Sequence, residues 1–222
     1  MANNATDKDL ISRVQGSAQK LNVAAKWSHG PSLKVADSFL LELFLLFRIV
    51  EDLQNTYDVE YDPGTIPNQN VFPQSGAAKQ TRPKFLVKDK ASKQTLCQIC
   101  PGTRVSDRDG HERAIDISFQ TATSPDVPTL QHLCQIFDAK YRKNDLKRIT
   151  SHEFSEFARW IDLFQLQGKS AGLTFKALTD LNAHCLVTNG EETTEKDTER
   201  QRRALREIAN FHPNKKHKSF PP

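Results

Sequence analysis

Two short apolar runs, each with an acidic residue inside it, constrain this chain more than any other feature. The first is Arg113–Phe119 (RAIDISF), with Asp116 at its centre, and the second is Gln131–Tyr141 (QHLCQIFDAKY), which contains Asp138 and Lys140. Side chains alternate between the faces of a strand, so Asp138 and Lys140 share one face. If the two runs pair in a sheet, two carboxylates and one amine converge.

Such a group has the minimum chemistry needed to hold a divalent metal ion and to orient a water molecule. Asp116, Asp138 and the backbone carbonyl of Ala139 are the candidate ligands, and Mg²⁺ is the candidate ion because it prefers oxygen ligands. Lys140 would orient the water or stabilise charge that develops at a phosphorus atom. The less specific alternatives are a strand-edge acid, a turn-capping acid and an exposed lysine.

The motif AIDISF followed by CQIFDAKYRK resembles the PD-(D/E)xK, or restriction-endonuclease-like, superfamily, and is similar to bacterial restriction and anti-phage defence nucleases. The resemblance spans residues 34–211, and its sharp part runs from Arg113 to Lys143. One position departs from the family's name, since Ile115 stands where that name has proline.

The resemblance implies an α/β fold with a αβββαβ core, a central mixed sheet flanked by helices in three layers. It also implies a nuclease that hydrolyses phosphodiester bonds, most simply in DNA, with Mg²⁺ that Mn²⁺ can replace. A further acid is implied on the first helix. Glu42 is the best candidate because it interrupts an apolar stretch where a charge is costly; Glu51 is the alternate, and Glu112 lies at an expected turn.

The positions of the basic residues say more about nucleic-acid binding than the net charge does, because that charge is only +4. Four of them follow the Asp138 motif directly, and we expect these to contact phosphates: Arg142, Lys143, Lys147 and Arg148. A second basic group lies between Arg200 and Lys218. For that group a solvated helix face, or contact with a partner subunit, is equally compatible.

Apolar spacing and turn residues predict the order of elements along the chain. Helices are expected at Leu33–Leu53, at Leu173–Leu181, at Asp197–Phe211, and after the capping-box sequence Thr150–Glu153. Asp58–Gln80 is expected to be a loop, and Pro101-Gly102 a turn. The expected strands are Lys84–Lys88, Thr95–Cys100, Ala114–Phe119, Leu133–Tyr141 and His184–Thr188.

This order predicts a polar helical extension over residues 1–30, a nuclease-like domain over 31–211 and a basic tail over 212–222. The longest apolar stretch, Phe39–Val50, is about half the length that a bilayer requires. With no signal-peptide pattern and no extracellular disulfide framework, the expectation is a cytoplasmic protein without membrane contact.

Other interpretations of the sequence compete with a nuclease, and one of them, a zinc site, rests on different residues. Cys97-Gln-Ile-Cys100, with Cys134 and His184-Cys185, has elements of a zinc site, but residues three apart on a strand point to opposite faces. A catalytically inactive module that binds nucleic acid or a partner is the alternative function, and a purely structural α/β domain is another. Because an unregulated nuclease would be toxic to its own cell, we expect a partner subunit or homo-oligomerisation to restrain its activity.

Overall fold

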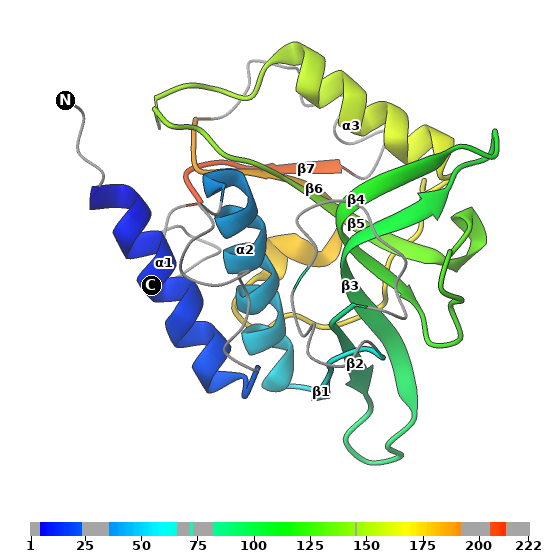
Figure 1. Ribbon diagram of the computed structural model, residues 1–222. Helices are drawn as coiled ribbons and strands as arrows, with labels where there is room; N and C mark the ends of the chain where they lie inside the picture. Colours follow the sequence, from blue (N-terminus) through cyan, green and yellow to red (C-terminus); the bar gives the residue numbers. More distant parts are fainter. Residues whose placement is uncertain are drawn as a thin grey trace.

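A seven-stranded mixed sheet carries helices on both of its faces in the computed structural model of this α/β protein (Figure 1). The structure describes residues 5–23, 36–65, 72, 82–144, 146–191 and 205–211. The helices are α1 (Ala5–Lys20), α2 (Asp37–Gln54) and α3 (Ser151–Leu163), with short 3-10 helices at Leu130–His132 and Thr179–Asn182. The strands are β1 (Asp58–Asp62), β2 (Lys84–Lys88), β3 (Thr95–Ser106), β4 (Glu112–Thr121), β5 (Leu133–Lys140), β6 (His184–Thr188) and β7 (Leu205–Ile208).

Strand order in space follows strand order in the chain, from β1 to β7. The pairs from β1 to β5 are antiparallel, whereas β5, β6 and β7 run parallel. A parallel pair needs a crossover connection, and the segment with α3 makes the one from β5 to β6. The antiparallel half and the parallel half therefore meet at β5, the strand that carries Asp138 and Lys140.

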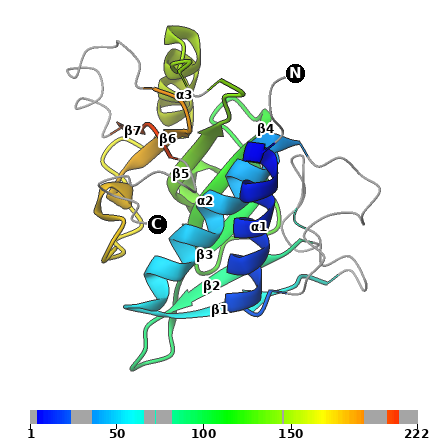
Figure 2. The ribbon, with the colours of Figure 1, turned by 90° about the vertical axis from the view of Figure 1, so that its left-hand side faces the viewer.

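Two apolar clusters, one on each face of the sheet, form the core. On one face α2 is buried nearly all round, as its sequence predicts, and α1 lies beside it (Figures 1 and 2). On the other face Phe154, Phe157 and Ile161 of α3 pack with Ile136 of β5. A helix that is apolar around most of its circumference needs cover on more than one side, and α1 supplies that cover to α2.

The predicted N-terminal helix is confirmed, but it is not an extension beside the domain. Leu10 and Val14 of α1 are buried in the same cluster as α2, so α1 belongs to the main core. The capping box is also confirmed: the Thr150 hydroxyl accepts a hydrogen bond from the Glu153 amide, and the Glu153 carboxylate accepts one from the Thr150 amide. It starts α3 where the sequence predicts.

Four expectations about local structure were wrong. Asp58–Asp62 is strand β1 rather than loop, and its acids pair with lysines of the next hairpin, as in Asp62–Lys84 at 2.6 Å. β3 runs through Pro101-Gly102 without a change of register, because pairing with β4 continues on both sides and Gly102 takes a positive φ of 54°. The range expected to be a helix, Leu173–Leu181, is helical only where the short 3-10 helix Thr179–Asn182 overlaps its end.

The fourth correction concerns the predicted charged helix at Asp197–Phe211. Residues 205–208 form β7, which adds to the open edge of β6 in parallel and buries Leu205 and Ile208. Local charge periodicity favoured a helix, but unpaired hydrogen-bonding groups on the edge of β6 favour a strand. Residues 197–204 of the prediction, most of the basic group after Arg200, and the tail at 212–222 lie outside the described residues.

Candidate functional site

Asp116 and Asp138 lie side by side because of the register between β4 and β5. The last ladder pair in this direction is Ile117 with Phe137, and one step further along the antiparallel strands Asp116 faces Asp138. Side chains directly opposite in such a pair have Cβ atoms about 4.5–5.5 Å apart. The two carboxyl groups are in hydrogen-bonding contact, so they share one face of the sheet.

The backbone of β5 also holds Asp116 in place. The Ala139 amide donates a hydrogen bond to Asp116 Oδ2 at 2.9 Å. Across the other edge of β4, the ladder has no pair where Gly102, with its positive φ, lies opposite Asp116. Asp116 is thus anchored toward β5, while the β3 side is locally irregular. The predicted role of the Ala139 carbonyl as a metal ligand stays a prediction.

Lys140 completes the β5 part of the site. Its Nζ lies 2.9 Å from Asp138 Oδ2, and its side chain keeps 25% of its exposure while that of Asp138 keeps 5%. Burial alone would lower the pKa of Lys140, but Asp138, Asp116 and Glu156 raise it above its ordinary value. The ammonium is therefore charged, and it reaches solvent from the rim of a buried acid.

Glu42 reaches the same site from α2. Burial and repulsion by Asp138 raise its pKa to about 7, although Lys140 acts in the opposite direction. Glu51, the alternate candidate, instead forms an ion pair with Arg48 at 3.0 Å. Glu112 is exposed and pairs with Arg104 at 3.7 Å. Of the three candidate glutamates, the structure brings only Glu42 to the two aspartates.

Three acidic side chains, those of Asp116, Asp138 and Glu42, lie close together and dominate the electrostatics of the site. Burial, repulsion by Asp138 and Glu42, and the hydrogen bond from Asp138 raise the pKa of Asp116 well above its ordinary range, against the opposing effect of the Ala139 amide. Like charges this close repel strongly where water is scarce. A cation would relieve that repulsion, so the carboxylates suit a positively charged ligand.

Sequence reasoning missed Glu156 of α3, which is exposed and acts electrostatically on Lys140. No local motif marks it, because its place depends on how α3 docks on the sheet. The only group of three acid, cysteine or histidine ligand atoms within 4.8 Å of one another in the described residues is Asp107, Asp109 and His111. That group is a turn, in which the Asp107 carboxylate accepts from Arg113 Nε at 2.6 Å and from two backbone amides.

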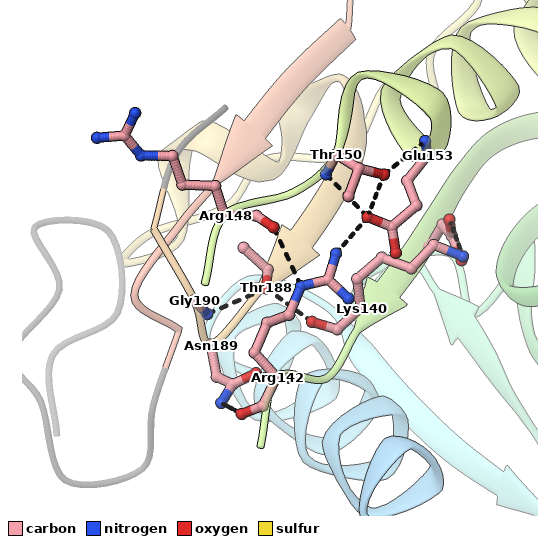
Figure 3. A network of polar contacts seen from close by, with 9 residues as sticks. Lys140, Arg142, Arg148, Thr150, Glu153, Thr188, Asn189 and Gly190 are labelled. Carbon is pink, nitrogen blue, oxygen red and sulfur yellow. Dashed lines mark hydrogen bonds and ion pairs between the residues drawn. The ribbon is translucent and has the colours of Figure 1, made fainter. Parts of the chain in front are cut away.

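The four basic residues expected to bind phosphate are used in different ways. Arg142 is mostly buried: its guanidinium pairs with Glu153 and donates to the Arg148 carbonyl at 3.3 Å (Figure 3). Arg148 is exposed and pairs with Glu191 at 3.3 Å. Lys143 and Lys147 are exposed. Arg142 therefore has a role inside the fold, and among the three exposed cations of the group only Lys143 and Lys147 form no ion pair with the described residues.

The rival residues Cys97, Cys100, Cys134 and Cys185 form no disulfide within the described residues, and burial raises the pKa of Cys97 and of Cys185. Gln135 points away from Asp138 and donates to the carbonyls of Leu181 and Ala183. No helix within the described residues is long and apolar enough to cross a membrane. Comparisons with protein-family models, curated proteins and solved structures give no match.

Proposed function

We propose that this protein is a metal-dependent nuclease that hydrolyses phosphodiester bonds, with DNA as its substrate. The observation that carries the proposal is the contact between the Asp116 and Asp138 carboxyls, with Lys140 ion-paired to the second of them. Two adjacent acids beside a phosphate backbone serve no purpose in a module that only binds nucleic acid, because they would repel it.

The residues present fit a divalent metal such as Mg²⁺, with Mn²⁺ as a substitute. Carboxylate oxygens are hard ligands, and Asp116 with Asp138 offers them from adjacent positions of a rigid sheet. The upward pKa shifts of Asp116 and Glu42 both arise partly from neighbouring acids, a repulsion that a bound dication would offset. When bound, the metal would supply Lewis-acid activation of water and of the phosphoryl group.

The side chains of the chain have distinct tasks in this proposal. Asp116 and Asp138 hold the metal and leave Lys140, at the end of β5, to face the phosphate. A charged ammonium placed there offsets negative charge that develops on the non-bridging oxygens in the transition state. Glu42 lies beside the two aspartates and is suited to accept a proton from the attacking water.

The order of elements supports the finer fold proposal. α2, β3, β4, β5, α3 and β6 occur along the chain in the order of the αβββαβ core that the resemblance implies, with β1 and β2 inserted between α2 and β3 and with β5 and β6 parallel. The helices on the two faces of the sheet agree with a three-layer sandwich. Extending the resemblance, we place the nuclease in a bacterial restriction or phage-defence system, in the cytoplasm, restrained by a partner subunit or by self-association.

The experiment is cleavage of supercoiled plasmid DNA by purified protein, alone and with its genomic neighbours, in Mg²⁺ and in EDTA. We expect nicking in Mg²⁺ that disappears in EDTA and in the Asp138→Asn variant. Asp109→Asn, which changes an exposed acid in a turn, is the matched control and should keep activity. Equal nicking by wild type and Asp138→Asn would reject the proposal in favour of a contaminant or another site.

A further inference from the structure

A compact loop joins β5 to α3 directly beside the site, and its base is closed by polar contacts. The Asn189 side chain accepts a hydrogen bond from the Arg142 amide at 2.6 Å and donates one to the Arg142 carbonyl at 2.7 Å. Arg142 Nε then reaches across to the carbonyl of Arg148 (Figure 3). Both ends of the loop are thus tied to each other and to the end of β6.

The far side of the loop packs on the chain that follows β6. The Lys147 carbonyl accepts a hydrogen bond from the Glu191 amide at 3.2 Å. Gly190 permits this approach, since a Cβ there would lie 2.0 Å from the Lys147 carbonyl oxygen. The Arg148–Glu191 ion pair adds a third contact. Contacts on both sides hold the loop in shape before any ligand arrives, which lowers the entropy cost of binding.

The described part of the loop displays one apolar side chain between two cations. Leu146 is 69% exposed, more than the other exposed large apolar residues, Leu96 at 42% and Val127 at 41%. Its amide donates to Asn144 Oδ1 at 3.0 Å, which fixes the turn below it. Lys143 and Lys147 are exposed on either side, and within the described residues neither ammonium forms an ion pair.

Few residues separate Leu146 from Lys140, so a DNA substrate bound at the site would extend as far as Leu146. Leu146 is six residues after Lys140, so its Cα lies at most about 20 Å from that of Lys140. Successive phosphates of one DNA strand are about 3.4 Å apart along the helix axis. Leu146 therefore lies within roughly six base pairs of a phosphate bound at Lys140.

We propose that this loop grips duplex DNA beside the cut, with Leu146 as an apolar wedge in the minor groove and with Lys143 and Lys147 on the flanking phosphates. The inference rests on the nuclease proposal and names the form of its substrate. Two exposed cations beside an exposed leucine match a groove that is lined by phosphates and that accepts apolar side chains between its base steps. Apolar side chains that enter the minor groove partly unstack a base step and bend the duplex.

The test is binding of a short fluorescent duplex and of the matching single strand, in Ca²⁺ so that the substrate is held without being cut. Leu146→Ser should weaken duplex binding about tenfold, by loss of the wedge, and leave the salt dependence unchanged. Lys147→Ser should flatten the salt dependence by about one unit of slope. Leu96→Ser, another exposed leucine, and Lys90→Ser, an exposed lysine in the β2–β3 hairpin, are the matched controls and should match the wild type.

A second readout detects the wedge itself. A duplex that contains 2-aminopurine should brighten when the wild type binds, because unstacking relieves its quenching, and should stay dim with Leu146→Ser. Duplex binding by Leu146→Ser within twofold of wild type, stronger binding of the single strand, or no binding of DNA would each overturn the inference. Plasmid nicking that needs Asp138 but not Leu146 would leave the nuclease proposal standing, so the two failures are distinguishable.

Discussion

Asp116 and Asp138 face each other directly across the β4–β5 pair, with their carboxyl groups in hydrogen-bonding contact. Like charges at opposed positions of a sheet destabilise the fold, and Glu42 adds a third acid. The three acids therefore lower the stability of the fold at the residues that we propose carry out the chemistry. Functional sites commonly hold such electrostatic strain, and stability can be gained by removing it.

Asp116→Asn should therefore stabilise the protein in metal-free buffer. The amide keeps an oxygen for the Ala139 amide and cannot ionise, so its burial beside Asp138 costs less than that of a carboxyl group. We expect a gain on the order of 1 kcal/mol, or roughly 2–4 °C in Tm for a chain of this size. Calorimetry with and without MgCl₂ measures it: Mg²⁺ should raise the Tm of the wild type and not that of the variant. A lower Tm for Asp116→Asn in EDTA would contradict the strained-site interpretation.

Lys140→Ala should abolish cleavage while the fold is retained. Its side chain lies at a strand end and reaches solvent, so the core loses little, whereas loss of a charge that stabilises the transition state costs about 100-fold or more in rate. Single-turnover cleavage with saturating protein separates this loss from weaker binding. Lys90→Ala is the matched control. Cleavage by Lys140→Ala at the wild-type rate would move the catalytic role elsewhere.

His184 makes the fold sensitive to acid. The ring is fully buried, with Nε2 at 2.9 Å from the Leu166 carbonyl and Nδ1 facing the Ile136 amide. Nε2 is therefore the protonated nitrogen and Nδ1 an acceptor. Burial lowers the pKa of His184. Because the unfolded state takes up a proton near pH 6.5 and the folded state does so only at lower pH, the free energy of unfolding falls as pH drops below about 6.5.

Two measurements test this expectation. Urea unfolding should show a lower free energy of unfolding at mildly acidic than at slightly alkaline pH. Nitrogen-15 NMR of the ring should show that the neutral tautomer with Nε2 protonated persists below about pH 6.5, where a free imidazole becomes charged. If the His184 ring became charged at the pH of a free imidazole, burial would not be perturbing it.

Arg142 should matter for stability more than Arg148. The Arg142–Glu153 pair has side chains only 15% and 22% exposed, against 55% and 41% for Arg148–Glu191. Arg142→Ala removes the cation paired with the largely buried Glu153 carboxylate, which keeps only its capping contacts with Thr150, and should cost about 2 kcal/mol. Arg148→Ala should cost about 0–1 kcal/mol. Urea denaturation of both variants measures the contrast. Equal losses would show that Arg142 has no special role in tying the loop to α3.

Gly190→Ala should destabilise the fold by about 1–3 kcal/mol, because its new methyl group would overlap the Lys147 carbonyl. Gly16→Ala is the opposite case. Gly16 lies inside α1 with open space around it, and replacing a helical glycine by alanine should stabilise by roughly 0.5–1 kcal/mol. Thermal unfolding compares the two variants. A neutral Gly190→Ala would mean that the loop tolerates displacement from β6.

The features that depend on near neighbours follow from the sequence alone. Alternation along β5 places Asp138 and Lys140 on one face, hydrophobic spacing defines α2, and the capping box starts α3 at Thr150. Each of these follows from backbone periodicity or from contacts within one turn of helix, which pattern reasoning captures.

Which distant groups meet depends instead on the tertiary structure. It brought Glu42 rather than Glu51 to the aspartates, added Glu156 from α3, enclosed Arg142 in an ion pair and made β7 from a charged segment. These outcomes depend on how elements dock and which sheet edge remains open, and those contacts join residues far apart in the chain. Their energies exceed local propensity, so a strand forms where charge spacing alone favoured a helix.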